Sequence, residues 1–214
     1  MKEADKSVLL VEGKDDQHVI WSLLEHYNVP DTFVVNDCDG IENLLRDVSL
    51  RLTTPTMYKY IGVVMDADVN IKARYDAFRS VLESTGMYDF SQIILSETGT
   101  LIKPSDENYP VIGLWLMPNN RNNGMLEDFV MTLADEKDVL MRESDAALSS
   151  LEQRSLNRYT PVHRLKAKIH TYLAWQEEPG KPMGQAITAK ILHAESESAK
   201  VFVEWIKRLF VPAT

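Results

Sequence analysis

The sequence predicts an α/β fold: a Rossmann-like three-layer domain with a mainly parallel sheet, followed by a C-terminal helical region. Over the first two-thirds of the chain, short apolar runs of strand length alternate with amphipathic segments of helix length, a pattern typical of parallel sheets covered by helices. The last third shows helical periodicity without a convincing strand. We therefore expect an α/β domain over residues 1–136 and a helical region over residues 137–214 packed on it.

The expected strands are continuous apolar runs, which indicate burial on both faces of the sheet. They cover residues 7–13, 32–37, 60–66, 92–95 and 111–117. The polar segment from 99 to 110 is expected to be a loop or a short hairpin. Helices are predicted where apolar residues recur three and four positions apart. Their apolar stripes cover residues 19–27, 41–52, 71–82, 126–133, 140–151, 162–173 and 202–209.

The charge and the cysteine content of the sequence limit the classes of function to be considered. The 23 basic and 32 acidic residues leave a formal charge of −9, which argues against a generic basic nucleic-acid module. It does not exclude an enzyme that reaches nucleic acid through a metal and a local basic patch. The single cysteine, Cys38, excludes an internal disulfide. We expect a cytoplasmic protein, because there is neither a membrane-spanning run nor a signal-peptide core.

Carboxylates end two of the predicted strands. Glu12 follows the first apolar run, and Asp66 and Asp68 follow the third. The carboxyl ends of parallel strands share one edge of the sheet, so these side chains can meet although they are far apart in sequence. Asp66 and Asp68 lie on the same side of an extended segment. Carboxylate oxygens are the ligands that Mg²⁺ prefers, so we expect a metal site here.

Structural explanations of the same acids remain open. Asp15 is suited to cap the helix that follows the first strand, and Asp16 is suited to its first turn. A salt bridge to Lys14 would account for Glu12.

Taken together, VEGKDD (residues 11–16) and VVMDAD (residues 63–68) resemble the Toprim domain, whose signature is a glutamate closing the first strand and a DxD closing a later one. The segment WLMPNNRNNGMLEDF (residues 115–129) resembles small stand-alone bacterial Toprim-like proteins of unassigned function, related to the overcoming-lysogenization-defect nucleases. An acidic pair opens a helix in those proteins, matching Glu127 and Asp128, which are otherwise ordinary first-turn acids. The resemblance covers about residues 7–130, and the helical tail is similar too. Asn120 departs from it, since we expect an aspartate there.

The resemblance implies phosphoryl transfer on DNA or RNA that depends on Mg²⁺, with Mn²⁺ as an alternative ion, and most directly a nuclease. One ion would be held by Glu12, Asp16, Asp66 and Asp68, and a second with help from Glu127 or Asp128. Glu12, Asp66 and Asp68 would be catalytic, with Glu12 also suited to act as general acid or base. Lys14, Lys166 and Lys168 are candidate phosphate ligands, although Lys166 and Lys168 are rather expected on a solvated helix face.

Two other functions remain open. VVMDADV also matches the nucleophile strand of haloacid-dehalogenase-type phosphatases, with Asp66 as nucleophile and Asp68 as acid–base. Alternatively, the chain is a non-catalytic Toprim scaffold that serves as partner or sensor for an ATPase, a function that suits its acidic charge. A homo-oligomer is compatible with each of these functions.

Overall fold

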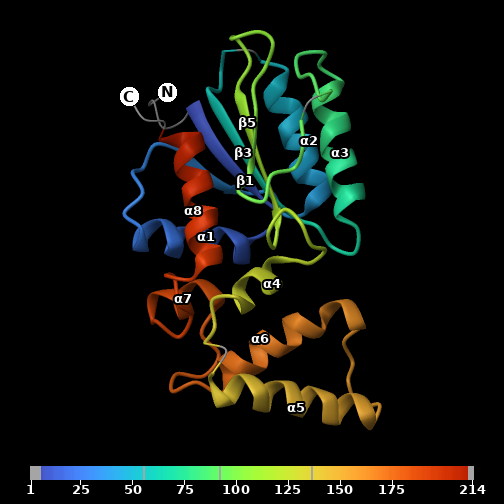
Figure 1. The fold of residues 1–214 in the computed structure, drawn as a ribbon, viewed down its shortest axis with the longest axis vertical. Coiled ribbons are helices and arrows are strands. Elements are labelled where there is room, and N and C mark those ends of the chain that lie inside the picture. The colour runs from blue at the N-terminus through green and yellow to red at the C-terminus, as the bar shows by residue number, and fades with distance from the viewer. Residues whose placement is uncertain (1–5, 55, 92, 136, 212–214) are drawn as a thin grey trace.

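A five-stranded sheet forms the centre of the protein (Figure 1). The computed structural model describes residues 6–54, 56–91, 93–135 and 137–211. The strand order is β2-β1-β3-β5-β4, in which β4 is antiparallel to β5 and the other neighbours are parallel. The predicted α/β class with a mainly parallel sheet is therefore confirmed. The strands are β1 (Ser7–Val11), β2 (Val34–Asp37), β3 (Tyr60–Asp66), β4 (Thr100–Ile102) and β5 (Val111–Met117).

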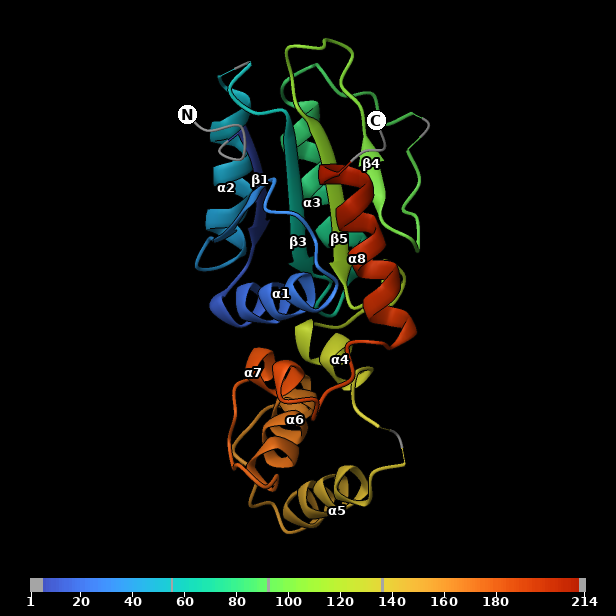
Figure 2. The ribbon, with the colours of Figure 1, turned by 90° about the vertical axis from the view of Figure 1, so that its left-hand side faces the viewer.

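Helices cover both faces of the sheet and extend beyond one edge of it. They are α1 (Lys14–His26), α2 (Ile41–Leu52), α3 (Ile71–Glu83), α4 (Leu126–Met131), α5 (Val139–Gln153), α6 (Arg164–Ala174), α7 (Met183–Thr188) and α8 (Glu197–Phe210), with a 3₁₀ turn at Pro161–His163. Figures 1 and 2 show α1 and α8 on one face of the sheet and α2 and α3 on the other. The result is a three-layer sandwich.

The two faces of the strands contribute to two separate cores. Leu9 and Val11 of β1 pack with apolar residues of α1 and α8. Val8 and Leu10 of the same strand pack with residues of α2 and α3. Because strand side chains alternate between faces, a strand covered on both sides reads as an unbroken apolar run.

Glycines in two central strands let α8 approach the sheet closely. A Cβ atom on Gly62 would lie 2.6 Å from Leu9 Cδ1 and 3.0 Å from Phe210 Cζ. A Cβ atom on Gly113 would lie 2.4 Å from Leu209 Cδ2. Helix α8 thus returns from the C-terminal third of the chain to complete one layer of the α/β sandwich.

The remaining helices lie beyond the carboxyl edge of the sheet. Helix α4 is next to this edge, α6 packs on α4, and α5 packs on α6 (Figure 2). Helix α7 packs on α1, where Gly184 has room for no side chain, since a Cβ atom there would lie 2.6 Å from the His18 carbonyl oxygen. The carboxyl edge therefore faces α4 and α6.

One predicted strand is wrong for the residues that the structure describes. Residues 93–95 have no regular structure, and Ile94 is 83% exposed, while Gln92 lies outside the described residues. The edge position next to β5 is taken instead by β4, which falls in the segment expected to form a loop or short hairpin. None of the described helices is long and apolar enough to cross a membrane.

Candidate active site

Glu12 and Asp66 meet at the carboxyl edge of the sheet. The backbone N–H of Asp66 donates to Glu12 Oε1 over 2.8 Å. Strands β1 and β3 are parallel neighbours with Val11 beside Val64, so the residues that follow each strand emerge side by side. The expected convergence of these two acids is therefore present in the fold.

Asp66 also fixes the start of α4. Its Oδ1 accepts a hydrogen bond of 2.9 Å from the backbone N–H of Leu126, the first residue of that helix. The next residue, Glu127, is buried. A carboxylate at the end of β3 and an acid in the first turn of α4 are brought together in this way.

Within the described part of the chain, Asp16 has one carboxylate oxygen that is hydrogen-bonded and one that is not. Helix α1 begins at Lys14 with Gly13 as its N-cap, so Asp15 is not the cap that its position suggested. Asp16 Oδ2 accepts from the Gly13 N–H at 3.1 Å. Its Oδ1 is buried and has no hydrogen-bond donor among the described residues.

The charges of these carboxylates are poorly compensated. Burial raises the pKa of Asp66 to about 9, with further contributions from the negative charges of Asp16, Glu12 and Glu127. Burial together with the Glu12 charge raises the pKa of Asp16 to about 7. Burial also raises the pKa of Glu12, although the hydrogen bond from the Asp66 N–H opposes this shift. Protons or a cation must therefore accompany these groups near neutral pH.

Glu127 has a lysine as its partner. Lys166 Nζ of α6 lies 2.9 Å from Glu127 Oε1, and the Glu127 side chain is only 6% exposed. Lys166 was expected on a solvated helix face, and its side chain is in fact 47% exposed, but its ammonium group reaches the acids. Asp128 instead binds the backbone, because its Oδ2 accepts from the Met125 N–H at 2.8 Å. Burial raises the pKa of Asp128.

Asp68 has an arginine as its partner. Its carboxylate forms an ion pair with Arg74 of α3. Its backbone exchanges two hydrogen bonds of 2.8 Å with Gly124, and its φ of 50° lies in the left-handed region. The turn at the end of β3 therefore does not continue the extended geometry that places two carboxylates of a DxD on one side.

Asn120, where the resemblance leads one to expect an aspartate, has a structural role. It is 4% exposed, and its Oδ1 accepts from the Leu116 N–H at 2.7 Å. It therefore ties the loop after β5 to that strand.

The acids line a hollow of about 460 Å³, which we call the acid pocket. Asp37 and Asp39, at the end of β2, also line it, although sequence reasoning did not select them. Their position after a predicted strand at the same sheet edge was the available signal. The charged and titratable residues that line the acid pocket are Glu12, Lys14, Asp15, Asp16, Asp37, Asp39, Asp66, Glu127, His163 and Lys166.

The donor set of the acid pocket suits a hard divalent cation. Carboxylate oxygens are the preferred ligands of Mg²⁺ and Mn²⁺, and Asp16 Oδ1 is a buried oxygen in need of a partner. As the side chains stand, no three His, Cys, Asp or Glu residues in the described ranges are grouped to hold one ion. Glu12, Asp66 and Asp128 instead accept from backbone N–H groups, and Asp68 and Glu127 pair with Arg74 and Lys166.

Two solved structures match nearly the whole chain. The C-terminal region of the OLD protein of Xanthomonas campestris pv. campestris has 19% identity and a TM-score of 0.50, with 95% of this chain and 93% of that chain covered. The C-terminal region of the Burkholderia pseudomallei OLD protein has 14% identity and a TM-score of 0.48, with 95% and 98% covered. At such identities the likeness concerns the fold alone. No curated protein matches the chain.

A family model described as "Protein of unknown function (DUF3226)" matches residues 6–211, and the chain belongs to that family.

Proposed function

We propose that this protein is a metal-dependent nuclease of the Toprim type, which hydrolyses phosphodiester bonds of DNA or RNA. The observation that carries the proposal is the meeting of Glu12, Asp16, Asp66 and Glu127 in one pocket, with a buried Asp16 oxygen that lacks a donor among the described residues. The Toprim-like motifs around Glu12 and Asp66 support the same function. The similarity of fold to the C-terminal region of an OLD protein is in keeping with it.

The residues of the acid pocket have distinct parts in the proposed reaction. Lys14 and Lys166 line the pocket and provide positive charge for the oxygens of a phosphodiester. Glu12 is held by the Asp66 N–H, and burial raises its pKa, which makes it a stronger base. It takes a proton from water, whose oxygen forms a bond to phosphorus. The bond to the leaving oxygen breaks, and that oxygen takes up a proton from solvent.

A divalent cation held by Asp16, Asp66 and Glu127 would supply Lewis-acid stabilisation of the phosphoryl oxygens. Burial and the neighbouring acids raise the pKa values of Asp16 and Asp66, and a cation among these groups would favour their ionised forms.

The test is cleavage of plasmid, single-stranded DNA and RNA by the purified chain with Mg²⁺, with Mn²⁺ and with EDTA. We expect cleavage only with a divalent ion, and none by Asp66→Asn. Asp76→Asn is the matched control, since Asp76 is a partly exposed acid of α3 that pairs with Lys72. Equal activity of wild type and Asp66→Asn would contradict the proposal.

A specific observation also favours the non-catalytic partner as a second candidate. Two acids of the expected site are already neutralised, Asp68 by Arg74 and Glu127 by Lys166. On this reading the pairs are structural, and the scaffold acts only with another protein such as an ATPase. Nucleic-acid cleavage that requires the partner and survives Asp66→Asn would favour it. The Asp68–Arg74 pair gives no support to the phosphatase alternative, in which Asp68 is the acid–base residue.

A further inference from the structure

Lys166 is the cation that helix α6 places in the acid pocket. Its ammonium group lies 2.9 Å from the buried Glu127 carboxylate, although its own side chain is 47% exposed. The hydrogen bond and charge of Glu127 raise the pKa of Lys166. Lys166 thus lies between a pocket rich in carboxylates and the solvent.

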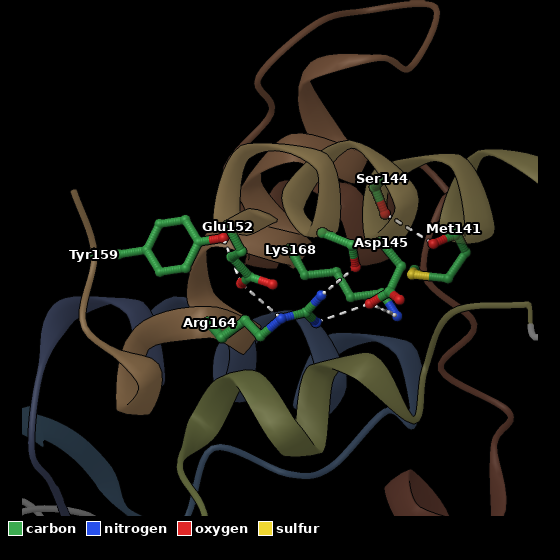
Figure 3. Close-up of polar contacts among 8 residues, drawn as sticks. Met141, Ser144, Asp145, Glu152, Tyr159, Arg164 and Lys168 are labelled. Carbon is green, nitrogen blue, oxygen red and sulfur yellow. Dashed lines mark hydrogen bonds and ion pairs between the residues drawn. The ribbon is translucent and has the colours of Figure 1, made fainter. Parts of the chain in front are cut away.

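Helix α6 is itself held by a second group of charges. Arg164, its first residue, donates to Asp145 and Glu152 of α5 at 2.8 Å each and to Ser149 at 3.1 Å (Figure 3). Lys168 Nζ lies 3.2 Å from Asp145 Oδ1. We call Arg164, Lys168, Asp145 and Glu152 the α5–α6 clamp.

The clamp ties the first residue of α6 to α5. Arg164 is two positions before Lys166, and His163, which also lines the acid pocket, is next to Arg164. Its three acceptors on α5 hold the guanidinium against that helix, and Figure 3 shows it pointing toward Asp145 and Glu152. Helix α6 also packs against α4, where Lys166 reaches Glu127. Arg164 is therefore placed to act as a positioning residue for Lys166.

We propose that Lys166 is a built-in, exchangeable cation: it holds Glu127 until a divalent ion binds in the acid pocket, and the ion then displaces it from this carboxylate. A buried carboxylate is costly without a cation, so Glu127 keeps Lys166 while no ion is bound. A divalent ion brings twice the charge, and the unpartnered Asp16 oxygen gives it a ligand that Lys166 leaves unused. The Lys166 side chain is 47% exposed, which gives the ammonium a route to solvent, where it can meet a phosphate.

This inference rests on the metal site of the proposed function but not on nucleic-acid cleavage. The test therefore measures Mn²⁺ binding to the whole chain by calorimetry without nucleic acid. If Lys166 competes with the ion, Lys166→Gln lowers the Kd for Mn²⁺ by about tenfold. Lys166→Arg, which keeps a cation at Glu127, leaves the Kd within about threefold of wild type.

Lys14→Gln is the matched control. Lys14 lines the same pocket, and the described residues include no ion pair of Lys14. The Lys14→Gln substitution removes one positive charge from the pocket and leaves the Lys166–Glu127 ion pair in place. It therefore measures the effect of the lost charge alone. A larger effect for Lys166→Gln than for Lys14→Gln supports exchange. Equal effects of the two substitutions overturn it, as does equal binding by wild type and Lys166→Gln.

Absence of Mn²⁺ binding by all of these proteins overturns the exchange together with the metal site. Binding without cleavage leaves the exchange standing and removes only the nuclease. The two proposals can therefore fail separately.

A measurement on the wild-type chain covers the case in which Lys166→Gln does not fold. Acetylation of individual lysines by acetic anhydride, followed by mass spectrometry, reports how free each amine is. With saturating Mg²⁺, Lys166 is expected to react several-fold faster while Lys14 does not. Unchanged or slower labelling of Lys166 under these conditions overturns the exchange. Arg164→Lys, which loosens the clamp and keeps its charge, should lower the Kd for Mn²⁺ in the same direction as Lys166→Gln.

Discussion

Carboxylates are gathered in two regions that both include residues of α6, and the two regions compensate their negative charge to different degrees. In the α5–α6 clamp, Arg164 and then Lys168 hold the pKa of Asp145 below its usual range. In the acid pocket, burial and neighbouring acids raise the pKa of Asp16 and Asp66 to about 7 and about 9. A paired carboxylate supports the fold, whereas a group of poorly paired ones costs stability and is typical of functional sites.

The largest difference between the regions is expected in catalysis. Glu12→Gln keeps an oxygen that can accept the Asp66 N–H but removes the base. We expect it to lower the cleavage rate by roughly 10²–10⁴-fold. Asp145→Asn in the clamp should change the rate by less than about tenfold, because Asp145 lies outside the acid pocket. Single-turnover cleavage of a labelled oligonucleotide measures both, and similar losses for the two variants would contradict the assignment of the acid pocket.

Binding of Mg²⁺ should separate the regions next. An ion that binds only the folded chain stabilises it by about 2.7 kcal/mol at 100 times its Kd. For a chain of this size we expect the melting temperature to rise by roughly 5–10 °C. Thermal unfolding with Mg²⁺ and with EDTA measures the shift. The shift should persist in Asp145→Asn and disappear in Asp66→Asn, and a shift retained in Asp66→Asn would place the ion elsewhere.

These two regions also differ in how far the sequence could predict them. Glu12 and Asp66 were expected to meet, because each ends a buried strand of a parallel sheet and the carboxyl ends of such strands share an edge. The orientation of Asp68 was not predictable, since its left-handed backbone depends on hydrogen bonds to Gly124 of a distant loop. The Lys166–Glu127 pair depends on the packing of α6 on α4, which no local pattern encodes.

Some parts of the fold could likewise be predicted from the sequence, and others could not. The central strands were predicted because both of their faces are buried, which leaves a strong apolar signal. The edge strand β4 has only three residues. The apolar run at 93–95 matches the pattern of a strand more closely than β4 does, which is why the sequence predicted a strand there. The packing of α8 on the sheet is indicated in the sequence only indirectly. Gly62 and Gly113 stand in the middle of apolar runs, at the positions where α8 approaches the strands closely.

The dependence of stability on pH should have opposite signs in the two regions. The folded-state pKa of Asp66 is raised to about 9, so the folded chain binds more protons than the unfolded chain between about pH 4 and 9. Stability without metal should therefore fall as the pH rises through this window. Asp66→Asn should remove part of the fall and be more stable than wild type at pH 8, on the order of 1–3 kcal/mol.

Asp145 should behave in the opposite way, because its pKa is lowered in the folded chain. Its contribution is present above its unfolded pKa of about 4 and is lost as the pH falls through the lower folded value. Urea unfolding of wild type, Asp66→Asn and Asp145→Asn at a series of pH values in EDTA measures both effects. A wild-type stability that rises from pH 5 to pH 8 would contradict the uncompensated state of the acid pocket.

The smallest expected effect is loss of the clamp itself. Arg164→Met removes the donor shared by Asp145, Glu152 and Ser149. The side chain is 29% exposed, so water and Lys168 replace part of the interaction, and we expect a loss of about 1–2 kcal/mol, or roughly 2–8 °C in melting temperature. High salt should weaken wild type toward the variant, because partly exposed ion pairs are screened. Arg154→Met, at the exposed end of α5, is the control, and equal melting temperatures of the two variants would show that the clamp does not hold α5 on α6.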